Sequence, residues 1–187
     1  MKNIKSYLIT DPNYFSDNKE IFKEKLIAVL KNHKIDFACF RDKSSKNIEE
    51  LAKIFLQICK EFEIENILIN SNISLAIKLG FDGVHLNSQQ FDKIENAKKS
   101  KLITIISCHN LEELEKAMNK NIDFVTYSPI FDTPNKGQSK GVDKLNEVIE
   151  KFPNLKIFAL GGIIQNEQIK EIEKTKAYGF ASIRYFI

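Results

Sequence analysis

The sequence predicts an α/β protein with a single (β/α)8 TIM barrel over residues 1–187, in a short form lacking the last helix. Short apolar runs alternate with amphipathic helical patterns along the whole chain, which is typical of a parallel sheet covered by helices. There are eight such runs, and the chain ends right after the eighth. A length of 187 residues also fits one domain, which would bury about 70% of its unfolded surface.

The predicted strands are short runs in which apolar side chains dominate. In chain order they cover residues 4–10, 35–41, 66–70, 82–86, 102–107, 122–127, 156–160 and 178–183. Between them, apolar residues recur every three or four positions, as on one face of a helix. Two helix starts show an N-cap Asn followed three residues later by Glu: Asn110 with Glu113, and Asn47 with Glu50.

An open, doubly wound sheet is the alternative to a closed barrel. That fold usually has a glycine-rich first turn, whereas residues 10–13 read Thr-Asp-Pro-Asn. The barrel has its own difficulty, because 187 residues lie below the usual lower end of about 200 for this fold. Short connections and a missing last helix account for the difference. The one long connection is 128–142. We therefore expect the barrel, undivided into further domains.

Composition excludes several classes of protein. A net charge of +3, spread evenly, does not indicate a nucleic-acid surface. Apolar runs stay well below the roughly 18 residues of a membrane span, and the start of the chain does not resemble a signal peptide. The three cysteines form no CxxC pair, which argues against a zinc site or a disulfide framework. We expect a cytoplasmic protein that binds neither nucleic acid nor membrane.

In a (β/α)8 barrel the loops that follow the strands build the active site. Many polar residues and both arginines of the chain fall at predicted strand ends, which favours a functional role for Arg41 and Arg184. This rim carries cations together with the flexible pair Gly161-Gly162, a combination that suits a phosphorylated ligand. The residues singled out at the rim are Thr10, Asp11, Arg41, Lys43, Asn70, His85, Ser107, His109, Ser128, Thr133, Asn135, Lys136, Gly161, Gly162, Ser182 and Arg184.

Three histidines and one cysteine have two interpretations each. His33 ends a helical pattern, where a surface contact with the helix dipole is the simpler interpretation. His85 is either a side chain that fills the barrel or a functional group. His109 follows the fifth strand, where helix amides and nearby cations favour a neutral imidazole that exchanges protons. Cys108 is either reactive or packed outward.

Seven segments of the chain together resemble the thiamine phosphate synthase/TenI superfamily. They occur in the family's order and spacing and cover nearly the whole sequence. The matching segments are 7–12 (YLITDP), 41–43 (RDK), 69–70 (IN), 82–86 (DGVHL), 107–109 (SCH), 128–136 (SPIFDTPNK) and 159–163 (ALGGI). The resemblance implies a (β/α)8 barrel that acts in thiamine biosynthesis.

For a synthase, the resemblance implies that hydroxymethylpyrimidine pyrophosphate is joined to a thiazole phosphate, with Mg²⁺ holding the leaving pyrophosphate. It assigns the pyrophosphate to Arg41, Lys43, Asn70 and Lys136, and the thiazole phosphate to Thr133, Gly162 and the backbone around Ile183 and Arg184. Ser107 matches the family's serine at that strand end.

The magnesium-binding acids of synthases are missing from this chain. Synthases have Asp directly after the Asn of the third strand and a second Asp shortly after the His-Leu of the fourth. The corresponding stretches here read Asn70-Ser71 and 85–90 (HLNSQQ). Since Mg²⁺ prefers anionic oxygen ligands, these neutral residues would leave the pyrophosphate charge poorly compensated.

The TenI branch therefore resembles this chain more closely. The thiazole tautomerisation of the TenI branch requires proton transfer and a phosphate-binding site but no metal. The catalytic histidine of that branch matches His109. Arg184 would contact either the phosphate or the substrate carboxylate. A thiamine-phosphate synthase is the first alternative, with Mg²⁺ as cofactor in that case alone. A non-catalytic regulator that binds thiamine phosphates is the second.

We also expect self-association. Without a last helix, apolar residues 185–187 would be exposed at the edge between the eighth and first strands, and burial against another copy would favour a homo-oligomer.

Overall fold

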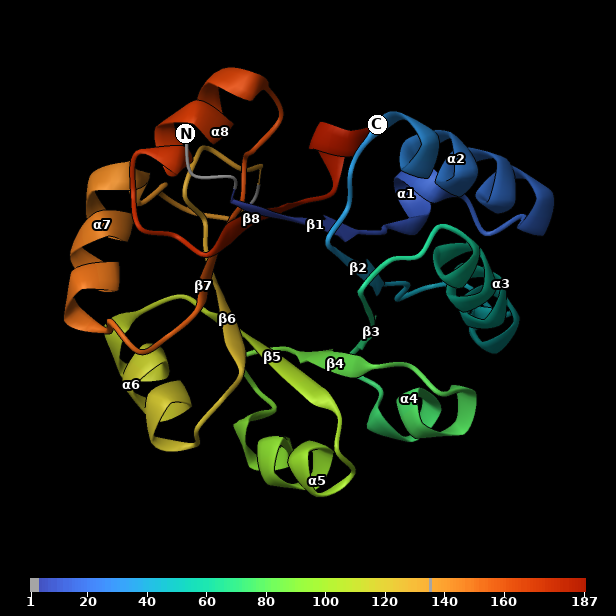
Figure 1. Ribbon diagram of the computed structural model, residues 1–187, viewed down its shortest axis with the longest axis horizontal. Coiled ribbons are helices and arrows are strands. Elements are labelled where there is room, and N and C mark those ends of the chain that lie inside the picture. The colour runs from blue at the N-terminus through green and yellow to red at the C-terminus, as the bar shows by residue number, and fades with distance from the viewer. Residues whose placement is uncertain (1–3, 135) are drawn as a thin grey trace.

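The computed structural model describes residues 4–134 and 136–187, so Asn135 of the 128–136 segment lies outside the described residues. Eight parallel strands form a closed barrel in sequence order, and pairing of the eighth with the first completes the ring. Figure 1 looks down on this ring, with the helices outside it. The predicted fold class is confirmed.

The strands coincide with the eight predicted runs to within two residues at each end. They are β1 Lys5–Ile9, β2 Phe37–Phe40, β3 Asn66–Asn70, β4 Gly83–Leu86, β5 Ile103–Cys108, β6 Phe124–Tyr127, β7 Ile157–Leu160 and β8 Gly179–Ser182. Their burial follows from the fold, because a parallel strand is covered by the lumen on one face and by helices on the other.

The eight α-helices of the described residues all lie between consecutive strands, and α1 and α2 share the connection from β1 to β2. The α-helices are α1 Pro12–Phe15, α2 Lys19–Asn32, α3 Ile48–Glu61, α4 Ile73–Leu79, α5 Ile94–Lys99, α6 Leu111–Asn119, α7 Gly141–Lys151 and α8 Asn166–Glu173, and single 3₁₀ turns occur at η1 Phe91–Lys93 and η2 Arg184–Phe186. None of the helices in the described part of the chain is long and apolar enough to cross a membrane.

One of the two predicted N-caps is confirmed. The Asn110 side chain accepts a hydrogen bond from the Glu113 amide at the start of α6 (2.8 Å). Asn47 precedes α3 but makes no capping bond, so that prediction is wrong. Its side-chain amide instead donates to the Asp17 carbonyl (3.3 Å), because the chain before α2 lies within its reach.

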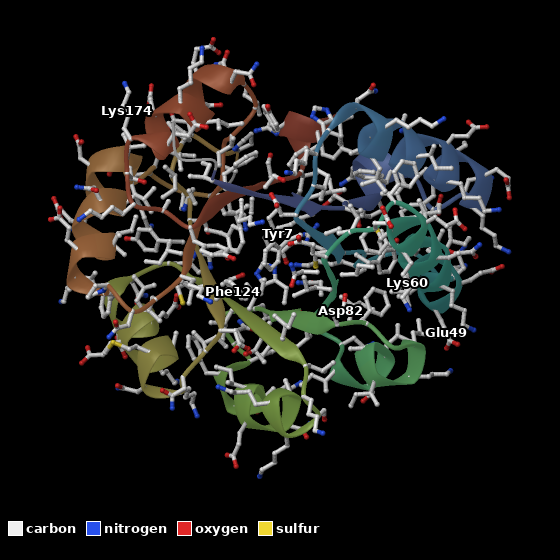
Figure 2. The ribbon with its side chains drawn as sticks, in the orientation of Figure 1. Tyr7, Glu49, Lys60, Asp82, Phe124 and Lys174 are labelled. Atoms are coloured by element: carbon white, nitrogen blue, oxygen red, sulfur yellow. The ribbon has the colours of Figure 1, made fainter. Side chains whose placement is uncertain are left out.

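The apolar core has two layers separated by the wall of the barrel. Inside the ring lie aromatic side chains such as Tyr7, Phe37, Phe124 and Phe158, all less than 10% exposed. Tyr7 and Phe124 are labelled within the ring of strands in Figure 2. Between strands and helices lies the larger aliphatic layer, which contains Cys108. The interior is therefore a packed core, and ligands have access at its mouth.

Aspartates fix the register at the amino ends of three strand pairs. Each precedes an even-numbered strand and accepts a backbone N–H at the start of the preceding strand. The pairs are Asp36 with Ser6 (2.9 Å), Asp82 with Ile67 (2.8 Å) and Asp123 with Thr104 (2.8 Å). These bonds satisfy amides that the sheet leaves unpaired, and they hold neighbouring strands at the same height.

The edge between β8 and β1 differs from the prediction for residues 185–187. Phe186 is only 3% exposed, because its ring stacks on Phe180 (centroids 5.8 Å apart) and meets His33 edge-on (5.4 Å). Ile187 alone is well exposed, at 59%. In Figure 1 η2 lies between α8 and α2, so the chain's own aromatic residues cover this edge. The predicted exposure of residues 185–187 therefore no longer supports self-association, which stays a prediction.

His33 is also more than a surface residue. It follows α2, is half-buried, and packs on the rings of Tyr185 and Phe186. Burial lowers the pKa of its imidazole, which favours the neutral ring in this aromatic contact.

We predict that Asp123→Ala lowers the free energy of unfolding by about 1–3 kcal/mol, because it leaves a buried donor unpaired. The Asp123 carboxylate accepts both the amide (2.8 Å) and the hydroxyl (2.6 Å) of Thr104, a residue with no exposed surface. Urea unfolding measures the change. Glu115→Ala, at an exposed position of α6, is the control and should change stability by less than about 0.5 kcal/mol. Equal effects of the two substitutions would contradict the register role.

Candidate active site

The carboxyl ends of all eight strands meet at one mouth of the barrel, and several predicted residues line it. Parallel register pairs Asn70 of β3 with His85 of β4, and Ser107 of β5 with Thr126 of β6. Arg41 follows β2 by one residue. Because side chains alternate along a strand, these positions face the lumen, whereas Ser71 and Cys108 face outward.

Arg41 forms an ion pair that the sequence analysis did not identify. Its guanidinium donates to the Asp11 carboxylate, and both side chains are largely buried. The Arg41 amide also donates to the Thr10 hydroxyl (2.9 Å), which ties the ends of β1 and β2 together. The signal was present in the strand order, since parallel β1 and β2 bring the residues after Ile9 and Phe40 side by side. Arg41 is thus oriented, with part of its charge compensated.

A cavity of about 630 Å³ opens among the loops that follow β2, β3 and β4. Lys43 and Asn70 line it together with Asp42, Ser71 and Asn72. Asp42 is turned to its own loop, where it accepts bonds from the amides of Ser44 and Ser45 (both 2.9 Å). Lys43 is therefore the exposed cation that the β2 loop places at this cavity. The neighbouring Asp42 carboxylate is hydrogen-bonded within its own loop.

The two stretches in which the resemblance places magnesium-binding acids form a neutral hydrogen-bonded set here. The Gln90 side-chain nitrogen donates to the Ser71 carbonyl (3.1 Å). The Gln90 side-chain oxygen accepts a hydrogen bond from the backbone N–H of Asn87 (3.1 Å). Asn87 in turn donates to the Ser71 hydroxyl (3.3 Å). Within residues 4–134 and 136–187, no group of three His, Cys, Asp or Glu side chains has a metal-binding arrangement. Since Mg²⁺ is usually held by one or two protein carboxylates, the neutral side chains of Ser71, Asn87 and Gln90 fit it poorly.

His109 has one ring nitrogen engaged. Its Nδ1 lies 3.2 Å from both the carbonyl oxygen and the hydroxyl of Ser128, the residue after β6. A carbonyl only accepts, so in a neutral ring the bond to it requires the proton on Nδ1 and leaves the lone pair on Nε2, whereas a bond from the Ser128 hydroxyl to Nδ1 would put the proton on Nε2. The backbone is held as well, because the His109 amide donates to Glu113 in α6 (2.6 Å). The ring is therefore oriented, with Nδ1 as the nitrogen that contacts Ser128.

The loop that follows β6 packs directly on the backbone of Gly161 and Gly162. Both have positive φ (99° and 70°), and a Cβ on Gly162 would lie 2.6 Å from the Asp132 carbonyl oxygen. The Phe131 amide donates to the Gly161 carbonyl (3.0 Å). The glycines are thus required by close packing, and this packing puts Thr133 beside them: its hydroxyl would lie 3.3 Å from a Cβ on Gly161.

Hydrogen bonds connect the loops after β7 and β8 near Gly161 and Gly162. The Ser182 hydroxyl donates to the Ile163 carbonyl (2.8 Å), and the Gln168 side chain reaches back from α8 to the Gly162 carbonyl (2.8 Å). Ile183 packs against the lumen cluster, and Arg184 begins η2, half-buried. Lys136 is exposed on the β6 loop, where its amide donates to the Thr133 carbonyl (3.2 Å). Three loops therefore meet around Gly162.

The structure places the two buried groups whose role the sequence left open. His85 fills the lumen at 3% exposure, and burial, with a smaller contribution from Arg41, lowers its pKa to about 4, so its ring is neutral near pH 7. Cys108 packs outward with no exposed surface, and burial raises the pKa of its thiol. A protonated, inaccessible thiol is unreactive, so Cys108 is a core residue.

Comparison with known proteins finds relatives named thiamine-phosphate synthase. A family model described as thiamine monophosphate synthase matches residues 6–186. A putative thiamine-phosphate synthase 2 of Aquifex aeolicus is 36% identical over 186 residues, covering 97% of this chain and 96% of that protein. Thiamine-phosphate synthase 1 of Streptococcus pneumoniae is 31% identical, covering 77% and 72%. A solved thiamine phosphate pyrophosphorylase from Pyrococcus furiosus superposes with a TM-score of 0.82 at 25% identity, covering 96% and 85%.

We predict that Gly162→Ala destabilises the protein more than Gly80→Ala does. Both positions have positive φ, which costs alanine about 1–2 kcal/mol. A Cβ at Gly80 meets nothing within 4 Å, whereas one at Gly162 would collide with the 131–132 backbone, adding about 1–3 kcal/mol of overpacking. Thermal unfolding of the two variants measures the difference. Indistinguishable melting temperatures would contradict the close packing of the β6 loop on Gly162.

Proposed function

We propose, from the premise that this chain belongs to the thiamine monophosphate synthase family and is an enzyme of thiamine biosynthesis, that it is a metal-independent thiazole tautomerase. Its substrate would be a non-aromatic thiazole that carries a carboxylate and a phosphate. The observation on which the proposal rests is the position of His109, whose Nδ1 lies 3.2 Å from the Ser128 carbonyl oxygen. With the proton on Nδ1, Nε2 would serve as the base.

In this reaction the double bond outside the ring moves into it. One proton leaves a ring carbon and one proton is added at the exocyclic carbon, so atoms and electrons balance without an oxidant or reductant. A histidine in neutral form accepts the first proton on Nε2, and the resulting imidazolium returns a proton at the second carbon. The bond from Nδ1 to the Ser128 carbonyl persists in both states and stabilises the cation formed between the two transfers.

The phosphate would bind where the loops after β6, β7 and β8 meet. Thr133 would supply a hydroxyl, which here donates to the Phe131 carbonyl (2.9 Å), Gly162 and Ile183 would supply backbone N–H groups, and Arg184 would supply charge. Such phosphate sites are common in the loops after strands 7 and 8 of these barrels. Arg41, Lys43 and Lys136 add positive charge around the mouth, which favours a dianionic ligand.

A magnesium-dependent thiamine-phosphate synthase is the second candidate, and the names of the relatives favour it. Arg41, Lys43, Asn70 and Lys136 are all retained, as that reaction would require. Against it stands the neutral set of Ser71, Asn87 and Gln90, whose amide and hydroxyl groups bind one another. A non-catalytic binder of thiamine phosphates differs from both candidates in showing no turnover.

We predict that His109→Ala lowers the rate of aromatisation at least about 100-fold, as expected for loss of a general base. Affinity for the aromatic thiazole phosphate should change less than about threefold, because the phosphate loops are untouched. Absorbance of the aromatic ring follows turnover, and calorimetry follows binding. His33→Ala, a histidine at the β8–β1 edge, is the control and should keep the parent rate. A His109→Ala enzyme with the parent rate would contradict the assignment.

We predict that aromatisation persists unchanged when the enzyme is treated with EDTA and assayed without divalent cations, because Ser71, Asn87 and Gln90 are neutral and the proton transfer requires no metal. The same preparation should not join hydroxymethylpyrimidine pyrophosphate to thiazole phosphate when Mg²⁺ is added. Condensation that depends on Mg²⁺ would instead support the synthase. Absence of both activities, with thiazole phosphate still bound, would support the binder.

A further inference from the structure

A chain of three polar side chains runs through the lumen from β1 to the mouth. The Tyr7 hydroxyl lies 2.9 Å from His85 Nδ1, and His85 Nε2 lies 3.0 Å from the Ser107 hydroxyl. Tyr7 and His85 are 0% and 3% exposed, whereas Ser107 is partly exposed. Figure 2 shows Tyr7 within the ring of strands. Water does not reach the buried part, so its hydrogen bonds must be made within the chain.

The protons of this chain have a preferred arrangement. His85 is neutral, so one ring nitrogen donates and the other accepts. A phenol is a stronger acid than a neutral imidazole, and burial keeps the Tyr7 hydroxyl protonated, so we expect Tyr7 to donate to Nδ1. The remaining proton is then on Nε2, which faces the hydroxyls of Ser107 (3.0 Å) and Thr126 (3.4 Å).

This arrangement determines what Ser107 can do at the mouth. When Nε2–H donates to the serine oxygen, the hydroxyl proton of Ser107 is free to donate elsewhere. In the opposite tautomer, Ser107 would donate to His85 and offer only lone pairs to a ligand. The buried Tyr7–His85 pair therefore decides whether the mouth presents a donor or an acceptor at β5.

We infer that Tyr7 and His85 are positioning residues that hold the Ser107 hydroxyl as a hydrogen-bond donor to the carboxylate of the substrate. The inference rests on the proposed function, in which the phosphate occupies the loops after β6, β7 and β8. Ser107 lies on β5, two residues before His109, so the second anionic group of the ligand is the one that would reach it. The site would thereby distinguish carboxylated thiazole phosphates from those that lack the carboxylate.

The tautomer is tested without any ligand, so this result is independent of the proposed function. Nitrogen-15 NMR of labelled histidine should show His85 with a protonated Nε2 and a bare Nδ1 at pH 7. Tyr7→Phe keeps the aromatic ring but removes the donor, and should convert His85 to a mixture of both tautomers. A His85 protonated on Nδ1 in the parent protein would overturn the inference.

The role of Ser107 is tested with two ligands that differ by one group: the aromatic thiazole phosphate with and without its carboxylate. Ser107→Ala should weaken binding of the carboxylated ligand about tenfold, and Tyr7→Phe about threefold to tenfold, by loss of one charge-assisted hydrogen bond or its orientation. Binding of the ligand without a carboxylate should change less than twofold in both. Adding Tyr7→Phe to Ser107→Ala should cause no further loss.

Thr126→Val is the matched control, because Thr126 also faces His85 Nε2 but at 3.4 Å, and the substitution keeps its shape. It should change neither affinity by more than twofold. Equal losses for both ligands, or additive effects of Tyr7→Phe and Ser107→Ala, would overturn the positioning role. If neither ligand binds the parent protein, the proposed function fails, while the NMR result still decides the tautomer.

Discussion

Backbone hydrogen bonds between β8 and β1 close the ring of strands, with Lys5 opposite Gly179 and Leu8 opposite Ser182. Closure leaves the barrel without a free strand edge, and it sends the carboxyl end of every strand to one mouth. The close approach of β8 to β1 requires glycine at position 179, since a Cβ there would lie 2.2 Å from the Lys5 carbonyl oxygen. Residues far apart in the sequence, such as Arg41 and Arg184, share a rim because the ring is complete.

Inside the ring, the side chains are apolar at the amino ends of the strands and polar at the carboxyl ends. The residues that stabilise the core are therefore separate from those that would bind a ligand. The amino end holds the rings of Phe37, Phe124 and Phe158, and the carboxyl end holds hydroxyl, imidazole and guanidinium groups. In the described part of the chain, every buried side-chain nitrogen or oxygen has a hydrogen-bond partner. Polar groups can therefore occupy the lumen at little cost, and they are held in place for a ligand at the mouth.

The fold was predictable because the signal is repeated eight times. Strands of four to six residues between amphipathic helices predict a parallel barrel even when the end of each strand is uncertain. The Asn110 cap was also predictable from four consecutive positions, whereas the Asn47 cap failed because Asp17, from another part of the chain, competes for that side chain. The burial of Phe186 was not predictable either, since its partners Phe180 and His33 come from different elements.

The site was predictable as a set of strand-end residues but not as a set of contacts. Pairing of Arg41 with Asp11 requires the relation between β1 and β2, and the bond from His109 to Ser128 requires that between β5 and β6. Gly161 and Gly162 were singled out correctly for position, yet the packing of the β6 loop on them is a tertiary fact. Local patterns name the residues, and the closed ring determines what they face.

A crystal structure with the carboxylated thiazole phosphate, grown in the presence of Mg²⁺, tests the central claim most directly. Metal-free proton transfer at this mouth predicts the phosphate among Thr133, Gly162 and Ile183, with His109 Nε2 against the thiazole ring and no ion between ligand and protein. A magnesium ion held by protein carboxylates, or a ligand bound away from His109, would contradict it.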